Sequence, residues 1–118
     1  MAHRPGKSPL DFGHLEAQTF GDRDLQRDLL ALFTEQCAAL LPTILRGVGT
    51  DASDAAHTLR GSALAVGAFA VASASAELER AGPTGGAGRE STVAALVASV
   101  DDALRAARSA GRVLSSSA

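Results

Sequence analysis

The chain has 118 residues, of which 46% are hydrophobic, and a formal net charge of −2. This length suits one domain with one hydrophobic core and excludes a second domain of that kind. There is no basic stripe and no Trp or Tyr on which bases could stack, so binding to a nucleic acid is excluded.

The apolar residues are mostly Ala, Leu and Val, which suit closely packed helices better than a sheet, so we expect an all-α fold. Residues 1–9 are expected to form a flexible tail. They lack the apolar run of a signal peptide, which favours a soluble, cytoplasmic protein. Residues 10–20 are predicted to form a short helix that Gly21 ends. The expected inward residues of this helix are Leu10 or Phe12, Leu15 and Phe20.

A long amphipathic helix is predicted to follow, with Asp22 as its N-cap. Pro42 should kink this helix or end its regular hydrogen bonding, and Gly47 and Gly49 close it. The residues that recur at three- and four-residue spacing, and are expected to face inward, are Leu25, Leu29, Leu32, Phe33, Cys37, Leu40, Leu41, Ile44 and Leu45.

Two further helices are predicted before residue 82. The first is capped by Thr50 or Asp51 and runs to about Val66, with Gly67 as its C′ stop. The second covers residues 68–81. Its expected inward residues are Phe69, Ala72, Ala76 and Leu78.

The glycine-rich residues 82–88 are predicted to form a loop before the last helix, which starts near Ser91. Its expected inward residues are Val93, Leu96, Val97, Val100 and Leu104. Short connections between helices of similar length predict an antiparallel up-down four-helix bundle over residues 10–112, with the short N-terminal helix across one end. Residues 113–118 are expected to fray, and the bundle to be a monomer without a membrane span.

The chemically informative helix is the one that contains His57. At 100° per residue, its buried face is predicted to hold Ala52, Ala55, Ala56, Leu59, Ala63 and Val66. Ser53, Arg60, Gly61 and Leu64 fall within about 60° of His57 on the other side. The imidazole is therefore expected to point away from the core.

Gly61 is unexpected here, because a glycine inside a helix costs on the order of 1 kcal/mol relative to alanine. Helical side chains lean toward the N-terminus, so a bare position 61 leaves the ring of His57 open to a large partner. Arg60 can place a guanidinium beside the imidazole, where a phosphoryl group would sit. Ser62 could add a hydroxyl at the edge of this patch, and Leu64 offers apolar surface for docking.

These residues resemble the conserved pattern of histidine-containing phosphotransfer (HPt) domains. Residues 56–62 read Ala-His-Thr-Leu-Arg-Gly-Ser, residues 66–68 read Val-Gly-Ala, and residues 78–79 read Leu-Glu. Residues 21–25 and 29–33 are similar to the family's helix opening, so the resemblance covers about residues 10–110. The family usually has Lys where this chain has Arg60, and a planar guanidinium presents its donors differently from an ammonium.

The resemblance implies that His57 accepts a phosphoryl group from a receiver-domain aspartate and passes it to another such aspartate. The partners would be receiver domains of hybrid histidine kinases and of response regulators, and the receiver would supply Mg²⁺. The protein itself would be a phosphocarrier rather than an enzyme, with no cofactor, metal or nucleotide site. A side chain from the neighbouring helix would orient the ring, with Glu79 as the first candidate and Gln36 as the second.

Other candidate sites are weaker. Cys37 is the only cysteine and is interpreted as a buried structural thiol. His3 and His14 have no matching glycine or cation nearby, and a three-histidine metal site would need distant residues to converge. Residues 82–88 lack the Gly-Lys-Ser/Thr ending and the preceding strand of a phosphate-binding loop.

Two alternatives remain open from the sequence. The chain could be a helical adaptor that docks a partner through the His57 face without carrying phosphate. It could also be the phosphoacceptor domain of a histidine kinase. In that case, labelled ATP and a kinase that lacks a receiver domain would phosphorylate it.

Overall fold

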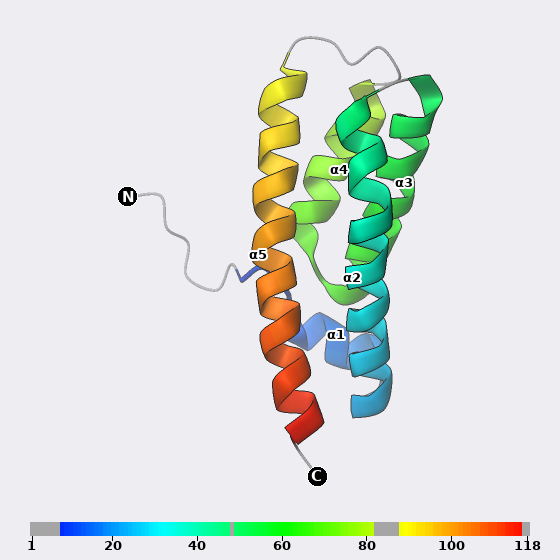
Figure 1. The fold of residues 1–118 in the computed structure, drawn as a ribbon. Coiled ribbons are helices and arrows are strands. Elements are labelled where there is room, and N and C mark those ends of the chain that lie inside the picture. The colour runs from blue at the N-terminus through cyan, green and yellow to red at the C-terminus, as the bar shows by residue number, and fades with distance from the viewer. Residues whose placement is uncertain (1–7, 48, 82–87, 117–118) are drawn as a thin grey trace.

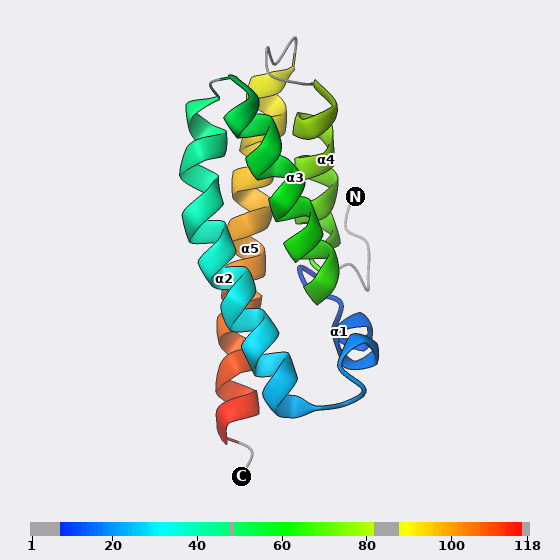
Figure 2. The ribbon, with the colours of Figure 1, turned by 90° about the vertical axis from the view of Figure 1, so that its right-hand side faces the viewer.

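In the computed structural model, residues 8–47, 49–81 and 88–116 are described. Within these residues the chain forms five α-helices and no strand: α1 (Phe12–Gln18), α2 (Arg23–Arg46), α3 (Gly49–Val66), α4 (Phe69–Ala81) and α5 (Arg89–Ser116). Helices α2 to α5 run alternately up and down, and α1 lies across the end where α2 begins and α3 ends (Figures 1 and 2). The predicted all-α bundle with an extra N-terminal helix is confirmed.

The four long helices surround one hydrophobic core. Each contacts the next in the chain, and α5 also contacts α2. Phe33 of α2, Leu78 of α4 and Leu96 of α5 are buried in this core. The buried residues of α3 are those predicted for its inner face, namely Ala52, Ala55, Ala56, Leu59, Ala63 and Val66. Because α3 buries this face, its opposite side is directed to solvent.

The N-terminal helix is shorter than expected, and the prediction that Phe20 faces the core is wrong. Because α1 ends at Gln18, Thr19 takes the buried place and Phe20 adopts a φ of +53° with 95% of its surface exposed. Phe12 is also about half exposed. The buried residues of this segment are Leu10, Leu15 and Thr19.

Helix α2 begins as predicted. The side chain of Asp22 accepts a hydrogen bond from the backbone N–H of Leu25 at 3.1 Å. The helix does not end at Pro42 but continues to Arg46, where Gly47 closes it with a φ of +61°. Pro42 is exposed, so the carbonyl that loses its helical partner can bond to water.

Three leucines that were expected to face inward are partly exposed instead, namely Leu25, Leu32 and Leu45. These leucines lie at the edges of the apolar stripe of α2. The part of α2 that is buried is narrower than the stripe that the three- and four-residue spacing predicted. Leu30, which that pattern omitted, is buried. Cys37 is buried as predicted, and desolvation raises the pKa of its thiol to about 11, so it stays protonated at neutral pH.

The turn between α3 and α4 requires a glycine, as predicted. Gly67 has a φ of +80°, and the N–H of Ala68 donates to the carbonyl of Ala63 at 2.8 Å, which completes a Schellman motif. A Cβ at position 67 would also lie 2.8 Å from the backbone oxygen of Asp11. The turn therefore fixes where the segment before α1 crosses the end of the bundle.

Several helix ends differ from those predicted. Helix α3 begins at Gly49, so Thr50 and Asp51 lie in its first turn rather than at its cap. Helix α5 begins two residues before Ser91 and continues past residue 112 to residue 116. Phe69 and Val97, expected to face inward, are 42% and 40% exposed. Residues 1–7 of the predicted tail, residues 82–87 of the predicted loop and residues 117–118 lie outside the described residues.

Arg89, at the start of α5, caps the end of α2. Its Nη2 donates to the backbone carbonyl of Ile44 at 2.8 Å. A cation at this place also interacts favourably with the C-terminal end of the helix dipole. A Cβ on Gly47 would lie 2.6 Å from the same Nη2, so the glycine leaves room for the guanidinium.

Arg89→Ala is expected to lower the free energy of unfolding by about 1–2 kcal/mol, because it removes a charge-assisted hydrogen bond to a partly buried carbonyl. Urea denaturation would measure the change. The matched control is Arg105→Ala, whose exposed ion pair with Asp101 is worth at most about 0.5 kcal/mol. Equal destabilisation by both substitutions would contradict the capping role.

Among the described helices, α2 alone is long and apolar enough to cross a membrane by length and composition. A core helix of a bundle passes the same test, and α2 buries Phe33, Cys37 and Ile44 against the other helices. The feature is thus weak support for a membrane span.

Candidate functional site

His57 lies near the middle of α3 on the side turned away from the core. Its side chain is 63% exposed, whereas Ala56 and Leu59 beside it are buried. The helical period explains this difference, since His57 is about 100° from Ala56 and about 200° from Leu59 around the helix axis. The prediction that the imidazole points outward is confirmed.

Glu79 of α4 holds the ring. Its Oε2 lies 2.5 Å from Nδ1 of His57. The hydrogen bond from His57 holds the pKa of Glu79 below its usual value; desolvation opposes this effect, and the charge of Arg60 supports it. An ionised carboxylate can only accept, so we assign the ring hydrogen to Nδ1, which leaves Nε2 with its lone pair.

Arg60 is bound to the same carboxylate. Its Nε donates to Oε1 of Glu79 at 3.0 Å, and its Nη2 lies 3.4 Å from Nδ1 of His57. The guanidinium is thus beside the imidazole, as expected, but at the Nδ1 edge and paired with Glu79. The ion pair joins α3 to α4, which pack against each other along their length.

The sequence left open whether Glu79 or Gln36 contacts the ring. In the described residues Nδ1 donates its hydrogen bond to Glu79, and no hydrogen bond joins Gln36 to His57. Gln36 is half-buried on α2. Glu79 reaches the ring because α4, on which it lies, packs against α3.

Gly61 is exposed one turn after His57. A Cβ built at this position meets nothing within 4 Å, so the packing of the fold does not require a glycine here. Leu64, on the same side of α3, is 41% exposed. The missing side chain therefore leaves open surface between the imidazole and an apolar residue.

Ser53 and Ser62 are both half-buried. Ser53 is about 40° from His57 around α3, whereas Ser62 is about 140° away. No hydrogen bond joins either hydroxyl to the imidazole in the described structure. Ser53 is therefore a candidate for a contact at the edge of the site, whereas Ser62 lies on the far flank of α3 from the imidazole.

His14 is not part of this site. Nε2 of His14 lies 2.8 Å from the carbonyl oxygen of Leu64, and its ring packs edge-on against Phe69. His3 lies outside the described residues. Where the structure describes the chain, no group of three or more His, Cys, Asp or Glu side chains could hold a metal ion.

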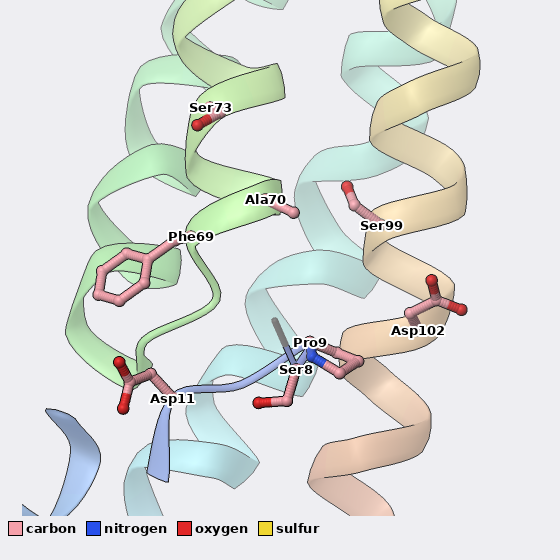
Figure 3. A pocket seen from close by; sticks show the side chains of 8 residues that line it. All are labelled: Ser8, Pro9, Asp11, Phe69, Ala70, Ser73, Ser99 and Asp102. Atoms are coloured by element: carbon pink, nitrogen blue, oxygen red, sulfur yellow. The ribbon is translucent and has the colours of Figure 1, made fainter. Parts of the chain in front are cut away.

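A pocket between α4, α5 and the segment before α1 is separate from the His57 site. Figure 3 shows its lining residues, which are Ser8, Pro9, Asp11, Phe69, Ala70, Ser73, Ser99 and Asp102. None of them contacts the imidazole through a hydrogen bond. His57 instead stands on an open helix surface, where a macromolecule can reach it.

The family model of the Hpt domain matches residues 28–110, which is more than half of the chain. This chain belongs to the Hpt domain family. Hpt domains serve histidine phosphotransfer in phosphorelays, which agrees with the exposed imidazole on α3. The match includes His57, Arg60, Gly61 and Glu79. No match was found among curated proteins or among solved structures.

Proposed function

We propose that this Hpt-domain protein is a phosphorelay intermediate in which Nε2 of His57 carries the phosphoryl group. It would accept the group from a receiver-domain aspartate and pass it to another such aspartate. The observation that supports this assignment most directly is the hydrogen bond from Nδ1 to Glu79, together with the exposure of the ring. That bond leaves the Nε2 lone pair as the free nucleophile.

The transfer step follows from this geometry. Nε2 would attack the phosphorus of the aspartyl phosphate, the P–O bond to the aspartate would break, and the carboxylate would leave with the electron pair. The ring then carries both the Nδ1 hydrogen and the phosphoryl group, so Glu79 stabilises the positive charge that develops on it. Arg60 adds positive charge beside the ring. The rest of the rate of transfer would come mainly from holding Nε2 in line with the phosphorus of the aspartyl phosphate.

The proposed partners are receiver domains of hybrid histidine kinases and of response regulators. We propose that the receiver supplies the Mg²⁺ needed for transfer, because no metal-binding cluster is found in the part of the chain that the structure describes. The chain would need no cofactor or nucleotide and would act as a phosphocarrier rather than an enzyme. We further propose that it acts as a monomer in the cytoplasm.

The docking surface is proposed to centre on His57, Gly61 and Leu64, and α2 extends it. Leu41 and Leu45 line a groove against α5. Leu32 lies about 140° from Leu45 around α2, on the flank nearer α3. Leu32 is 49% exposed and Leu64 41% exposed, so α2 and α3 each offer an exposed apolar side chain.

Leu32 was expected in the core because the spacing of leucines in α2 continues without a break. Leu32 lies at the edge of the apolar stripe of α2, and this position could have indicated from the sequence that it is exposed. Ser53 completes the edge of the proposed docking surface.

Phosphotransfer profiling tests the proposed function. The purified protein would be incubated with each receiver domain of the source organism after that receiver has been phosphorylated. We expect one or a few receivers to label the protein rapidly, with an acid-labile, base-stable phosphate. ATP with a kinase that lacks a receiver should not label it. Absence of label from every receiver would favour the adaptor alternative, and direct labelling by such a kinase would favour the kinase-domain alternative.

A further inference from the structure

A groove follows the line along which α2 packs against α5. Two adjoining hollows share Thr34 and Leu104, so they form one depression. We refer to it as the α2/α5 groove: it extends from Arg27 to Leu45 along α2 and from Val100 to Gly111 along α5. The stretch of α2 is about 27 Å long, or about five turns, so the groove has the length of a helix of about 18 residues.

Apolar side chains on both walls of this groove are left open by the bundle. On α2, Leu45 is 49% exposed and Leu41 is partly buried. On α5, Leu104 is partly buried and Val97 is 40% exposed. Val97 lies about 20° from Leu104 around the helix axis, so it continues the same row of side chains. The described chain does not cover this apolar surface, which is typical of an interaction site.

One end of the groove is positively charged, because Arg27 and Arg108 both line it. The guanidinium of Arg27 pairs with Asp24 at 2.8 Å, whereas no ion pair of Arg108 is found within the described residues. No acidic residue follows Asp102 in the sequence, so the next turns of α5 offer Arg108 no counter-charge. This end of the groove therefore favours a carboxylate from a partner.

Two features of the backbone also suit a closely packed partner. A Cβ at Gly111 would meet nothing within 4 Å, so the fold does not require a glycine at this place in α5. Pro42 has no N–H, so the carbonyl of Ala38 lacks its helical hydrogen bond, and both residues line the groove. The groove thus offers room beside one helix and an open hydrogen-bond acceptor on the other.

The groove lies on the side of the bundle opposite His57. Helices α2, α3, α4 and α5 contact one another in a closed ring, so the α2–α5 pair is opposite the α3–α4 pair that holds His57 and Glu79. Around α2, Leu45 in the groove and Leu32 on the flank nearer α3 are about 140° apart. A partner in the groove would therefore leave the imidazole accessible.

We propose that the α2/α5 groove binds an amphipathic α-helix of a partner protein. The apolar stripe of that helix packs against Leu41, Leu45 and Leu104, and an acidic side chain at one end pairs with Arg108. A second copy of this chain fits less well, because no acidic side chain lines the groove and two copies packed groove to groove would leave Arg108 without a counter-charge. The inference goes beyond the proposed function, since it assigns a second surface that holds a partner while a receiver occupies His57.

Two synthetic helical peptides of about 18 residues test this assignment. Both carry the same leucine stripe, and they differ only at one end, which has glutamates in one peptide and lysines in the other. Fluorescence anisotropy should show that the glutamate peptide binds about five- to tenfold more tightly, because lysines would be repelled by Arg27 and Arg108. The amide NMR signals that shift on binding should belong to α2 and α5 rather than to the surroundings of His57.

Arg108→Glu should abolish the preference for the glutamate peptide. Arg105→Glu is the matched control, because it makes the same change of charge on the same helix but does not line the groove. Leu45→Glu should weaken the binding of both peptides about tenfold or more, since it places a charge in the apolar contact. The three side chains are exposed, so circular dichroism should show that each variant folds.

The assignment fails if neither peptide binds at concentrations up to about 1 mM. Equal effects of Arg105→Glu and Arg108→Glu on the preference would also overturn it, because the charge effect would then not belong to the groove. Self-association of the wild-type protein that Leu45→Glu abolishes, measured by analytical ultracentrifugation, would make a second copy the occupant instead.

A receiver that labels the protein should label it equally when the glutamate peptide is bound, whereas competition would show that the two surfaces overlap. The peptide measurements require no phosphate on His57. Failure of the proposed function is therefore distinguishable from failure of this inference.

Discussion

His57→Gln is expected to keep the bundle folded and to abolish acceptance of phosphate from a phosphorylated receiver. The substituted amide has no nucleophilic nitrogen, so the loss should be complete. The fold should tolerate the change, because the side chain is 63% exposed and its neighbours in the core are untouched. The free energy of unfolding should stay within about 1 kcal/mol of wild type.

The measurement is radiolabel transfer from a receiver that labels the wild-type protein, with urea denaturation as the check on folding. His14→Gln is the matched control. The Nε2 of His14 is engaged with the backbone carbonyl of Leu64, and in the described structure no hydrogen bond joins His14 to the imidazole of His57. We expect this control to keep its label. Label on the His57→Gln protein would show that another residue is the phosphoacceptor.

Gly61→Gln is expected to slow phosphotransfer by about 100-fold, because a side chain at position 61 leans over the turn that carries His57 and displaces the receiver. The same substitution should raise the free energy of unfolding by about 0.5–1 kcal/mol, since glutamine is the better helix former and the space is open. The prediction therefore separates function from stability. Rapid-quench kinetics with the labelling receiver would measure the rate.

Gly61→Ala is the control for this experiment. It should give a similar gain in stability, but it adds only a Cβ and leaves most of the approach to the ring open. We expect a much smaller effect on transfer than glutamine produces. If both variants transfer phosphate at the wild-type rate, the glycine has no steric role. If glutamine unfolds the bundle, the space at position 61 is not open.

Local sequence patterns predicted much of the fold. The N-cap at Asp22 and the stop at Gly67 depend on the backbone of a few consecutive residues, so their signals are short and were read correctly. The six buried residues of α3 follow from its period alone. The same period failed for Leu32 and Phe69, because it orders residues around a helix without fixing how far the neighbouring helices extend over its flanks.

Phe20 shows a second limit. Its apolar side chain continued the predicted inward face, but α1 ends at Gln18 and the chain then turns through a left-handed residue. The end of a seven-residue helix depends on packing more than on intrinsic preference, since so short a helix is not stable by itself. Thr19 could therefore replace Phe20 in the core.

The sequence by itself determined that His57 stands on the outer side of α3 beside a bare glycine, because both properties follow from residues within one or two turns of one helix. Tertiary structure decided which group holds the ring. Glu79 is 22 positions from His57 in the chain, and it reaches Nδ1 only because α3 and α4 pack antiparallel after the turn at Gly67. Helical period fixes the face of each residue, whereas the rotation of one helix against another is set by how their side chains pack.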